Sequence, residues 1–292
     1  LSSVQGTDSN MGTASGNNSW IRRCIFNGSI NYDRTFAEKH NVYGQLKYDY
    51  EYNDQTGTNT TVYRHNISLF AHYGFANKYL LDVALVESGS SRLAPGSKWA
   101  FSPNVSAAWN ISNESFMENV KWVDFLKLRG SFGLTGRDNT TAWLWMQHYG
   151  IWNKTSDNAV FGEGTTNSGQ SIRMDNGNAD VNYDVHWDKS YKANFGIDFN
   201  VLSQRLAVTL EAYKVWNREM FMNLSQSVPA TVGCLSASTN LGKIDNWGYE
   251  ASVTWRDKIG KDFKYRIGVN FGYSDNKVIN SDFATDYVYK TV

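Results

Sequence analysis

Four features are scarce in this 292-residue sequence, and each scarcity excludes a class of protein. The formal net charge is zero, with 28 basic and 28 acidic residues, so no overall basic field attracts nucleic acid. No run approaches the roughly 18 apolar residues that a transmembrane helix needs. The two cysteines, Cys24 and Cys234, fit no metal-ligand spacing, although a disulfide between them stays open for an oxidising compartment. Only three prolines interrupt the chain, which favours long paired strands.

Aromatic residues are abundant, and residues 263–276 show how they are arranged. In the stretch FKYRIGVNFGYSDN an apolar side chain occupies every second position from 263 to 273, with aromatic rings at both ends and aliphatic side chains between them. This period of two predicts a β-strand with one apolar and one polar face. Ten steps give roughly 33 Å of strand, and a tilt of about 40° reduces this to roughly 25 Å of height. That is the height of the apolar band of a transmembrane β-barrel, whose two borders carry aromatic girdles.

The alternation recurs in roughly ten segments, most of them longer than the average strand of about five or six residues. The expected strands lie at 20–36, 42–52, 63–75, 79–85, 105–111, 126–134, 191–199, 206–212, 247–255 and 263–276. Short turns are expected at 38–40, 76–78 and 257–262, a short helical turn within 115–124, and long loops at 88–98, 136–186 and 219–239. Short turns at one end and long loops at the other are typical of outer-membrane barrels. A soluble β-sandwich, the competing interpretation, has shorter strands and less regular loops.

Six stretches, in order, carry a more specific pattern. They are NKYLLDVAL (77–85), SGSSRLAPGSKWAFSPNVSAAWNISNESFM (88–117), VKWVDFLKLRGSFGLTGRDN (120–139), NFGIDFNVLSQRLAVTLEAYK (194–214), TNLGKIDNWGYEASVTW (239–255) and FKYRIGVNFGYSDNKV (263–278). The most specific pieces are residues 90–92 with Pro95, Gly96 and Trp99, and later residues 134–136. Together these stretches resemble the C-terminal half of the SusC/RagA family of TonB-dependent outer-membrane transporters, which occur in the Bacteroidetes and import nutrients.

The resemblance implies an all-β fold, an antiparallel transmembrane β-barrel of about 22 strands with a plug domain inside it. Residues 1–292 would be one partial barrel domain, with extracellular loops at about 88–98, 136–186 and 219–239. The plug, a TonB-contacting segment, the terminal aromatic residue and many strands are not in this sequence, and no apolar leader precedes Leu1. We therefore expect a mature chain or a piece of a longer one, because an open half-barrel leaves unpaired strand edges in lipid. Glu87 and Leu93 depart from the family, which more often has Asp and Phe there.

The function that the resemblance implies is import across the bacterial outer membrane and not catalysis. A SusD-like surface lipoprotein would capture an oligosaccharide or a peptide, and the TonB–ExbB–ExbD system would pull on the plug. Two alternatives stay open: a small self-contained porin or adhesin without TonB coupling, and a soluble all-β binding or enzyme domain. We find no catalytic set and no nucleotide or zinc motif, and expect no cofactor. His65 and His72 lie seven positions apart on one expected strand, so they face opposite sides and predict no metal site.

An aromatic island in the loop at 136–186 is the candidate substrate-binding site. It consists of Trp143, Trp145, Tyr149 and Trp152. On an extracellular loop such rings would stack on sugar faces or pack against peptide side chains; alternatively, they extend a strand or contact a partner. The polar face of the strands would form a wetted inner wall. Its charged members are Lys127, Arg129, Lys192, Asp198, Glu250, Lys264 and Arg266.

Overall fold

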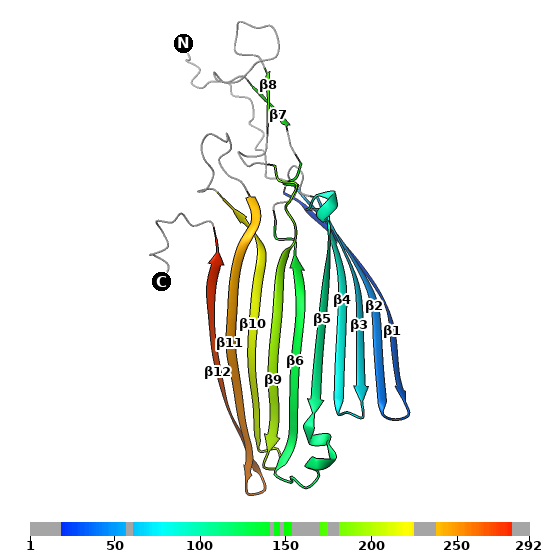
Figure 1. Cartoon of the computed structure of the whole chain (residues 1–292), viewed down its shortest axis with the longest axis vertical. Helices are drawn as coiled ribbons and strands as arrows, with labels where there is room; N and C mark the ends of the chain where they lie inside the picture. The colour runs from blue at the N-terminus through cyan, green and yellow to red at the C-terminus, as the bar shows by residue number, and fades with distance from the viewer. Residues whose placement is uncertain are drawn as a thin grey trace, which may run out of the picture.

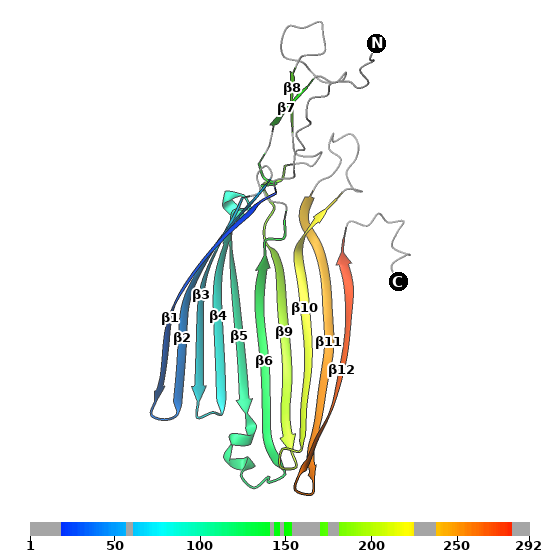
Figure 2. The same cartoon turned by 180° about the vertical axis from the view of Figure 1, so that it is seen from behind.

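The computed structural model describes residues 19–56, 61–140, 143–146, 149–153, 170–174, 181–224 and 238–281, and its main feature is a ten-stranded antiparallel sheet (Figures 1 and 2). The strands are β1 (Ile21–Phe36), β2 (His40–Gln55), β3 (Val62–Phe75), β4 (Tyr79–Ser90), β5 (Trp99–Asn110), β6 (Val123–Arg137), β9 (Asp188–Val201), β10 (Leu206–Asn223), β11 (Ser238–Ile259) and β12 (Phe263–Asn280). They pair in chain order, with β1 and β12 at the two ends of an open sheet. Strands β7 (Tyr149–Asn153) and β8 (Gln170–Met174) form a separate hairpin. The prediction of a partial antiparallel barrel of about ten strands is confirmed.

The two ends of the sheet differ in their connections. At one end, here named the turn end, the strands are joined through residues 37–39, 76–78, 111–122, 202–205 and 260–262. A hydrogen bond closes each of the first two turns. The amide of Lys39 donates to the carbonyl of Phe36 (3.1 Å), and the amide of Lys78 donates to the carbonyl of Phe75 (2.8 Å). Both central residues of each turn have positive φ, as in the type I′ turn whose twist matches that of the strands.

The connections at the opposite end, here named the loop end, include the two longest ones, between β6 and β9 and between β10 and β11 (Figure 1). The connection from β4 to β5, also at this end, contains the 3₁₀ turn η1 (Pro95–Ser97). At the turn end, the expected helical turn between β5 and β6 forms as η2 (Ile111–Asn113) and η3 (Ser115–Met117). Among the described residues, no helix combines the length and hydrophobicity needed to cross a bilayer.

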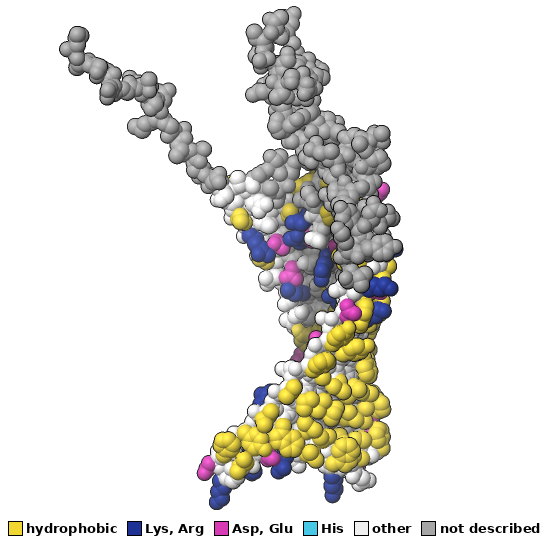
Figure 3. Space-filling model, turned by 90° about the vertical axis from the view of Figure 1, so that its left-hand side faces the viewer, with side chains coloured by type: hydrophobic (Ala, Val, Ile, Leu, Met, Phe, Trp, Pro, Cys, Tyr) yellow, Lys and Arg dark blue, Asp and Glu magenta, His cyan; other side chains and the backbone are white. Residues whose placement is uncertain are grey.

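The register of the sheet aligns the apolar positions of neighbouring strands on one face, here named the outer face. Leu46 lies opposite Leu69, which lies opposite Leu85 on the next strand. Phe132 and Phe195, in the middle of the sheet, are each 52% exposed, so this exposure is not an effect of the sheet edges. Figure 3 shows hydrophobic side chains in a continuous area on one side of the sheet. An apolar surface of this extent is unfavourable in water and fits contact with lipid.

Aromatic rings border the outer face at two heights. Toward the turn end, the ring of Tyr79 stacks between Phe75 (6.5 Å between centroids) and Trp109 (6.4 Å). Toward the loop end, the ring of His65 lies between Tyr48 (6.1 Å) and Trp99 (6.3 Å). On β3 the two rows are ten residues apart, which is about 33 Å of strand and about 25 Å of height at the usual tilt. Both girdles expected of a membrane-spanning sheet are therefore present.

Several strands run farther toward the loop end than the alternation indicates. β4 continues to Ser90, β10 continues to Asn223 and β11 begins at Ser238. The period-two signal arises only where one face meets an apolar medium. Backbone pairing continues beyond that boundary, where apolar and polar side chains no longer alternate strictly, so the sequence pattern does not register it.

Candidate functional site

Ion pairs link neighbouring strands across the polar face of the sheet, here named the inner face. Near the loop end, Glu51 lies between Arg23 (2.9 Å) and Arg64 (3.7 Å), and the Nε of Arg64 lies 2.8 Å from Asp138. The hydroxyl of Ser90 donates a further hydrogen bond of 2.7 Å to Asp138. This chain of charges reaches from β1 across β2 and β3 to the segment that follows β6.

A second group of charges surrounds Arg129 at mid-height. Its guanidinium contacts Asp198 on β9 (3.0 Å) and Glu211 on β10, and Asn194 donates to Glu211 (3.3 Å). The guanidinium lies over Gly196, where a Cβ atom would come within 2.6 Å of it, so glycine leaves the space that the ion pair occupies. Two of the charged wall residues identified in the sequence, Arg129 and Asp198, are thus paired with each other.

The remaining charged wall residues are distributed along the inner face. Lys127 lies opposite Asp198, Glu250 lies opposite Glu211, and Lys192 lies opposite Gly133 and Val215. The two others, Lys264 and Arg266, lie at the turn end. This wall offers hydrogen-bonding and charged groups to water or a passing solute.

The histidines of β3 face opposite sides of the sheet. His65 lies in the aromatic row of the outer face and shares a hydrogen bond of 2.8 Å with the hydroxyl of Tyr48. His72 contacts Asp82, which also accepts a hydrogen bond from Ser106 (3.2 Å), on the inner face. Within the described part of the chain, no group of three His, Cys, Asp or Glu side chains is placed to hold a metal ion. Cys24 is exposed on β1, and Cys234 lies outside the described residues.

The specific stretch between β4 and β5 is tied to distant segments at the loop end. The hydroxyl of Ser91 accepts a hydrogen bond from the amide of Tyr63 (2.9 Å), and the amide of Ser91 donates to the carbonyl of Tyr63 (3.0 Å). Arg92 donates to the carbonyl of Thr140 (3.1 Å), and its own carbonyl accepts from the amide of Trp143 (3.4 Å). Ser91 and Arg92, which belong to the specific residues 90–92, therefore connect the β4–β5 loop to the start of β3 and to the segment that follows β6.

A small apolar cluster at the loop end is the main hydrophobic core of the described residues. It contains Leu93 (1% exposed), Val185 and Trp187. Ala100, Leu144 and Phe221 pack against it, so segments far apart in the chain meet there. The indole of Trp187 also donates a hydrogen bond of 3.2 Å to the carbonyl of Lys98. Leu93, one of the two positions that depart from the family, is thus a central packing residue.

The structure describes the side chains of only two members of the aromatic island. Trp143 and Trp145 are half-buried, with ring centroids 5.9 Å apart and planes tilted by 42°. Both indole N–H groups are buried and lack a hydrogen-bond partner. Tyr149 and Trp152 belong to β7, where they lie opposite Met174 and Ser171 on β8. The role of the four residues in substrate binding stays a prediction.

The seam between β5 and β6 opens toward the loop end. Pairing runs from Asn110 opposite Lys127 up to Asn104 opposite Gly133, and ends next to Pro103, which has no amide hydrogen to donate. Above that point side chains replace the backbone ladder. Asn104 donates to the carbonyl of Leu134 (3.4 Å), and Ser102 accepts from the amide of Gly136 (3.1 Å). A cavity of about 360 Å³, lined by Trp99, Phe101, Leu134 and Trp187 among others, lies over this seam.

At the turn end, Glu114 joins the β3–β4 turn to the segment between β5 and β6. Its carboxylate accepts hydrogen bonds from Lys78 (3.0 Å) and from the indole of Trp109 (3.0 Å). A hydrogen bond from Tyr79, followed by those from Lys78 and Trp109, lowers the pKa of Glu114 from 4.5 to about 2. The group is therefore ionised at all physiological pH values and braces the turn end.

Comparisons with known proteins agree with this geometry, although no family model matches the chain. TonB-dependent receptor P39 of Formosa agariphila is 27% identical over 279 residues, which are 86% of this chain and 25% of that protein. TonB-dependent receptor SusC of Bacteroides thetaiotaomicron is 24% identical over 241 residues, 81% of this chain and 23% of that protein. Both organisms are Bacteroidetes, and both relatives are receptors and not enzymes. The chain thus spans about a quarter of the length of these relatives.

Solved structures show the same fold. The RagAB peptide importer in its closed-closed state matches with a TM-score of 0.76 and 18% identity, over 91% of this chain and 31% of that chain. The siderophore receptor PirA from Pseudomonas aeruginosa matches with a TM-score of 0.54 and 9% identity, over 89% of this chain and 44% of that chain. At these identities the likeness concerns the fold alone, which is a long antiparallel sheet of the kind that forms part of a β-barrel wall.

Several residues of the site were not identified from the sequence. Asp138 and Trp187 lie within or next to an expected loop, where no alternation marks them. The sequence does hold one signal, because Asp138 lies two residues after the specific residues 134–136 and Trp187 immediately precedes β9. Their partners, Arg64 and Leu93, are more than 70 positions away. Such pairings cannot be obtained from spacing in a single sequence.

Proposed function

We propose that this chain, a wall segment of an outer-membrane β-barrel similar to SusC-type TonB-dependent receptors, takes part in TonB-dependent import of a nutrient. The observation that carries the proposal is the ten-stranded sheet with a lipid-facing outer side, two aromatic girdles and a charged inner side. Its edge strands β1 and β12 would pair with strands from the rest of the protein, because unpaired backbone groups are very unfavourable in lipid.

The orientation follows from the connections. The loop end would be extracellular and the turn end periplasmic, since outer-membrane barrels have long extracellular loops and short periplasmic turns. The substrate class we propose is an oligosaccharide or a peptide, delivered by a SusD-like surface lipoprotein. TonB–ExbB–ExbD would act through a plug located in the part of the protein outside this chain.

Trp143 and Trp145 are the described residues that we propose for substrate contact, together with Tyr149 and Trp152 on β7. The first two rings sit beside the apolar cluster of the loop end, through Leu144 between them. This position gives a firm support to aromatic surfaces, which suits stacking against a sugar ring or an apolar peptide side chain.

The full-length protein, purified in detergent from native outer membranes, tests the proposal on a denaturing gel with and without boiling. The expected polypeptide has about four times the 33.1 kDa mass of this chain, since 279 matched residues make up 25% of the P39 receptor. It should shift in mobility on boiling and co-purify with a lipoprotein. A boiling-sensitive polypeptide near 33.1 kDa without a partner would instead identify a small self-contained barrel.

A further inference from the structure

Four cations face one another in pairs at the turn end of the last two strands. Arg256 on β11 lies directly opposite Arg266 on β12, and Lys258 lies directly opposite Lys264. Because side chains alternate along a strand, all four project to the inner face, and we name them the basic rim. Like charges directly opposite each other destabilise a sheet, so a bound anion would stabilise this arrangement.

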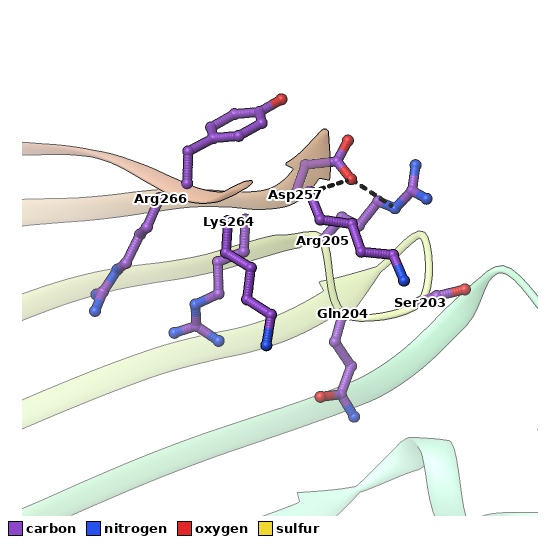
Figure 4. Close-up of a pocket in the computed structure, with 9 residues that line it drawn as sticks. Ser203, Gln204, Arg205, Asp257, Lys264 and Arg266 are labelled. Atoms are coloured by element: carbon purple, nitrogen blue, oxygen red, sulfur yellow. Dashed lines mark hydrogen bonds and ion pairs between the residues drawn. The ribbon is translucent and has the colours of Figure 1, made fainter. Parts of the chain in front are cut away.

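The nearest carboxylate does not supply that compensation. Asp257 occupies the alternate position between Arg256 and Lys258 and lies on the other side of the strand, where it contacts the Nε of Arg205 (3.6 Å). Figure 4 shows Asp257 joined to Arg205, with Lys264 and Arg266 pointing to the opposite side. A cavity of about 480 Å³ adjoins these residues, and it is lined by the basic rim, by Ser203 and Gln204 of the β9–β10 turn, and also by Tyr265 and the Arg205–Asp257 pair. Within the described part of the chain, the basic rim has no ion-pair partner.

A third pair of facing cations, at the loop end and on the outer side of the sheet by strand alternation, shows how such a pair is compensated within this chain. Arg218 on β10 lies opposite Lys189 on β9. Each has its own carboxylate, since Arg218 lies 2.6 Å from Asp245 and Lys189 lies 2.7 Å from Glu219. Arg129 likewise has two acidic partners within the sheet. These two groups of cations are therefore neutralised by carboxylates of the same sheet, whereas the basic rim is not.

We propose that the basic rim binds an acidic, extended segment of the same protein, from the part that lies outside this chain. The inference rests on the proposed barrel, because closure of the barrel is what makes the inner face a lumen. Lipid phosphates belong to the outer face, whereas about three quarters of the length of the relatives lies outside the stretch that this chain matches. That remainder offers ample chain to lie within the lumen.

The geometry of the basic rim specifies the segment. Cations two residues apart on one strand are separated by about 6.6 Å, and neighbouring strands are about 4.8 Å apart. Carboxylates at positions i and i+2 of an extended peptide have the same 6.6 Å spacing and lie on one side of it. An Asp or Glu, any residue, and a second Asp or Glu would therefore place one carboxylate between the members of each facing pair.

Carbodiimide cross-linking of the full-length protein tests this, because the reagent joins a lysine amine to a carboxylate in direct contact. Mass spectrometry should find Lys258 or Lys264 joined to an Asp or Glu outside residues 1–292 of the same polypeptide. The Lys78–Glu114 pair, with its 3.0 Å contact, is the internal control and should cross-link in the same sample. The Arg256→Gln/Arg266→Gln variant keeps both lysines but halves the charge, so the rim cross-link should fall severalfold while the control cross-link stays unchanged.

The outcomes separate this inference from the proposed function. If the protein shifts on boiling and Lys78 joins Glu114, the barrel is intact. If Lys258 and Lys264 then form no cross-link, the inference is wrong. This holds whether the two lysines are accessible to acetylation or shielded by lipid. A cross-link to a separate protein also overturns it. If neither the boiling shift nor the control cross-link appears, the proposed barrel fails, and the lumen on which the inference depends fails with it.

Discussion

The loop end and the turn end of this sheet are held by different kinds of contact. At the turn end, the hydrogen bonds of the hairpin turns join residues three positions apart, as between Phe36 and Lys39. At the loop end, Leu93 packs against Val185 and Trp187, and Arg64 contacts Asp138, so the partners lie far apart in the chain. The hairpin turns of one end are therefore specified by local geometry, to which the Glu114–Lys78 contact adds one long-range link, whereas the loop end depends on contacts that exist only once the sheet has formed.

The largest effect is expected from removing the centre of the loop-end cluster. Leu93→Ala deletes the most buried side chain of the described residues and should lower the local stability of residues 181–187 by about 2–4 kcal/mol. Hydrogen exchange in the full-length protein measures this, with faster exchange expected at the loop end and unchanged exchange at residues 36–40. Leu241→Ala, at a side chain that is 48% exposed, is the matched control. Equal acceleration at both ends would show that the two ends do not behave independently.

An intermediate effect is expected on ligand capture at the loop end. Trp143→Ala with Trp145→Ala removes two adjoining aromatic surfaces and should weaken ligand binding about tenfold, equivalent to about 1.4 kcal/mol. Binding to the purified transporter complex is the measurement, and the boiling-induced gel shift should be retained. Trp122→Ala removes an exposed ring at the turn end and serves as the control. Unchanged binding and uptake in the double variant would exclude these two rings from the site.

The smallest effect is expected at the turn end and depends on pH. Because the pKa of Glu114 falls from 4.5 to about 2 on folding, its contribution to stability is complete above pH 4.5 and is lost as the pH falls toward 2. Glu114→Gln should therefore reduce the temperature of the boiling shift at pH 6, and the difference from the parent should shrink by pH 3. Glu118→Gln, a change at an exposed neighbour, is the control. A difference that stays constant between pH 6 and pH 3 would refute the assignment.

Sequence reasoning predicted the strands well because their cause is local. Alternation in FKYRIGVNFGYSDN reflects lipid on one side of β12 and water on the other, and a single chain records that pattern without knowledge of its neighbours. The resemblance carried by residues 90–92 and 134–136 supplied the transporter family, and the comparisons with SusC and RagAB agree with it. The structure describes the side chains of two members of the aromatic island, Trp143 and Trp145. The residues that surround them at the loop end could not be predicted from the sequence.

The sequence alone therefore determined the two-faced strands, their order, and the contrast between short and long connections. Only the tertiary structure decided which charges meet. Arg129 finds Asp198 and Glu211 across β9 and β10, whereas Arg256 and Lys258 face other cations. The physical reason is register: a shift of one residue moves every side chain to the other face, and a shift of two changes every partner. Register is set by strand pairing across the whole sheet, so no single segment of the sequence contains it.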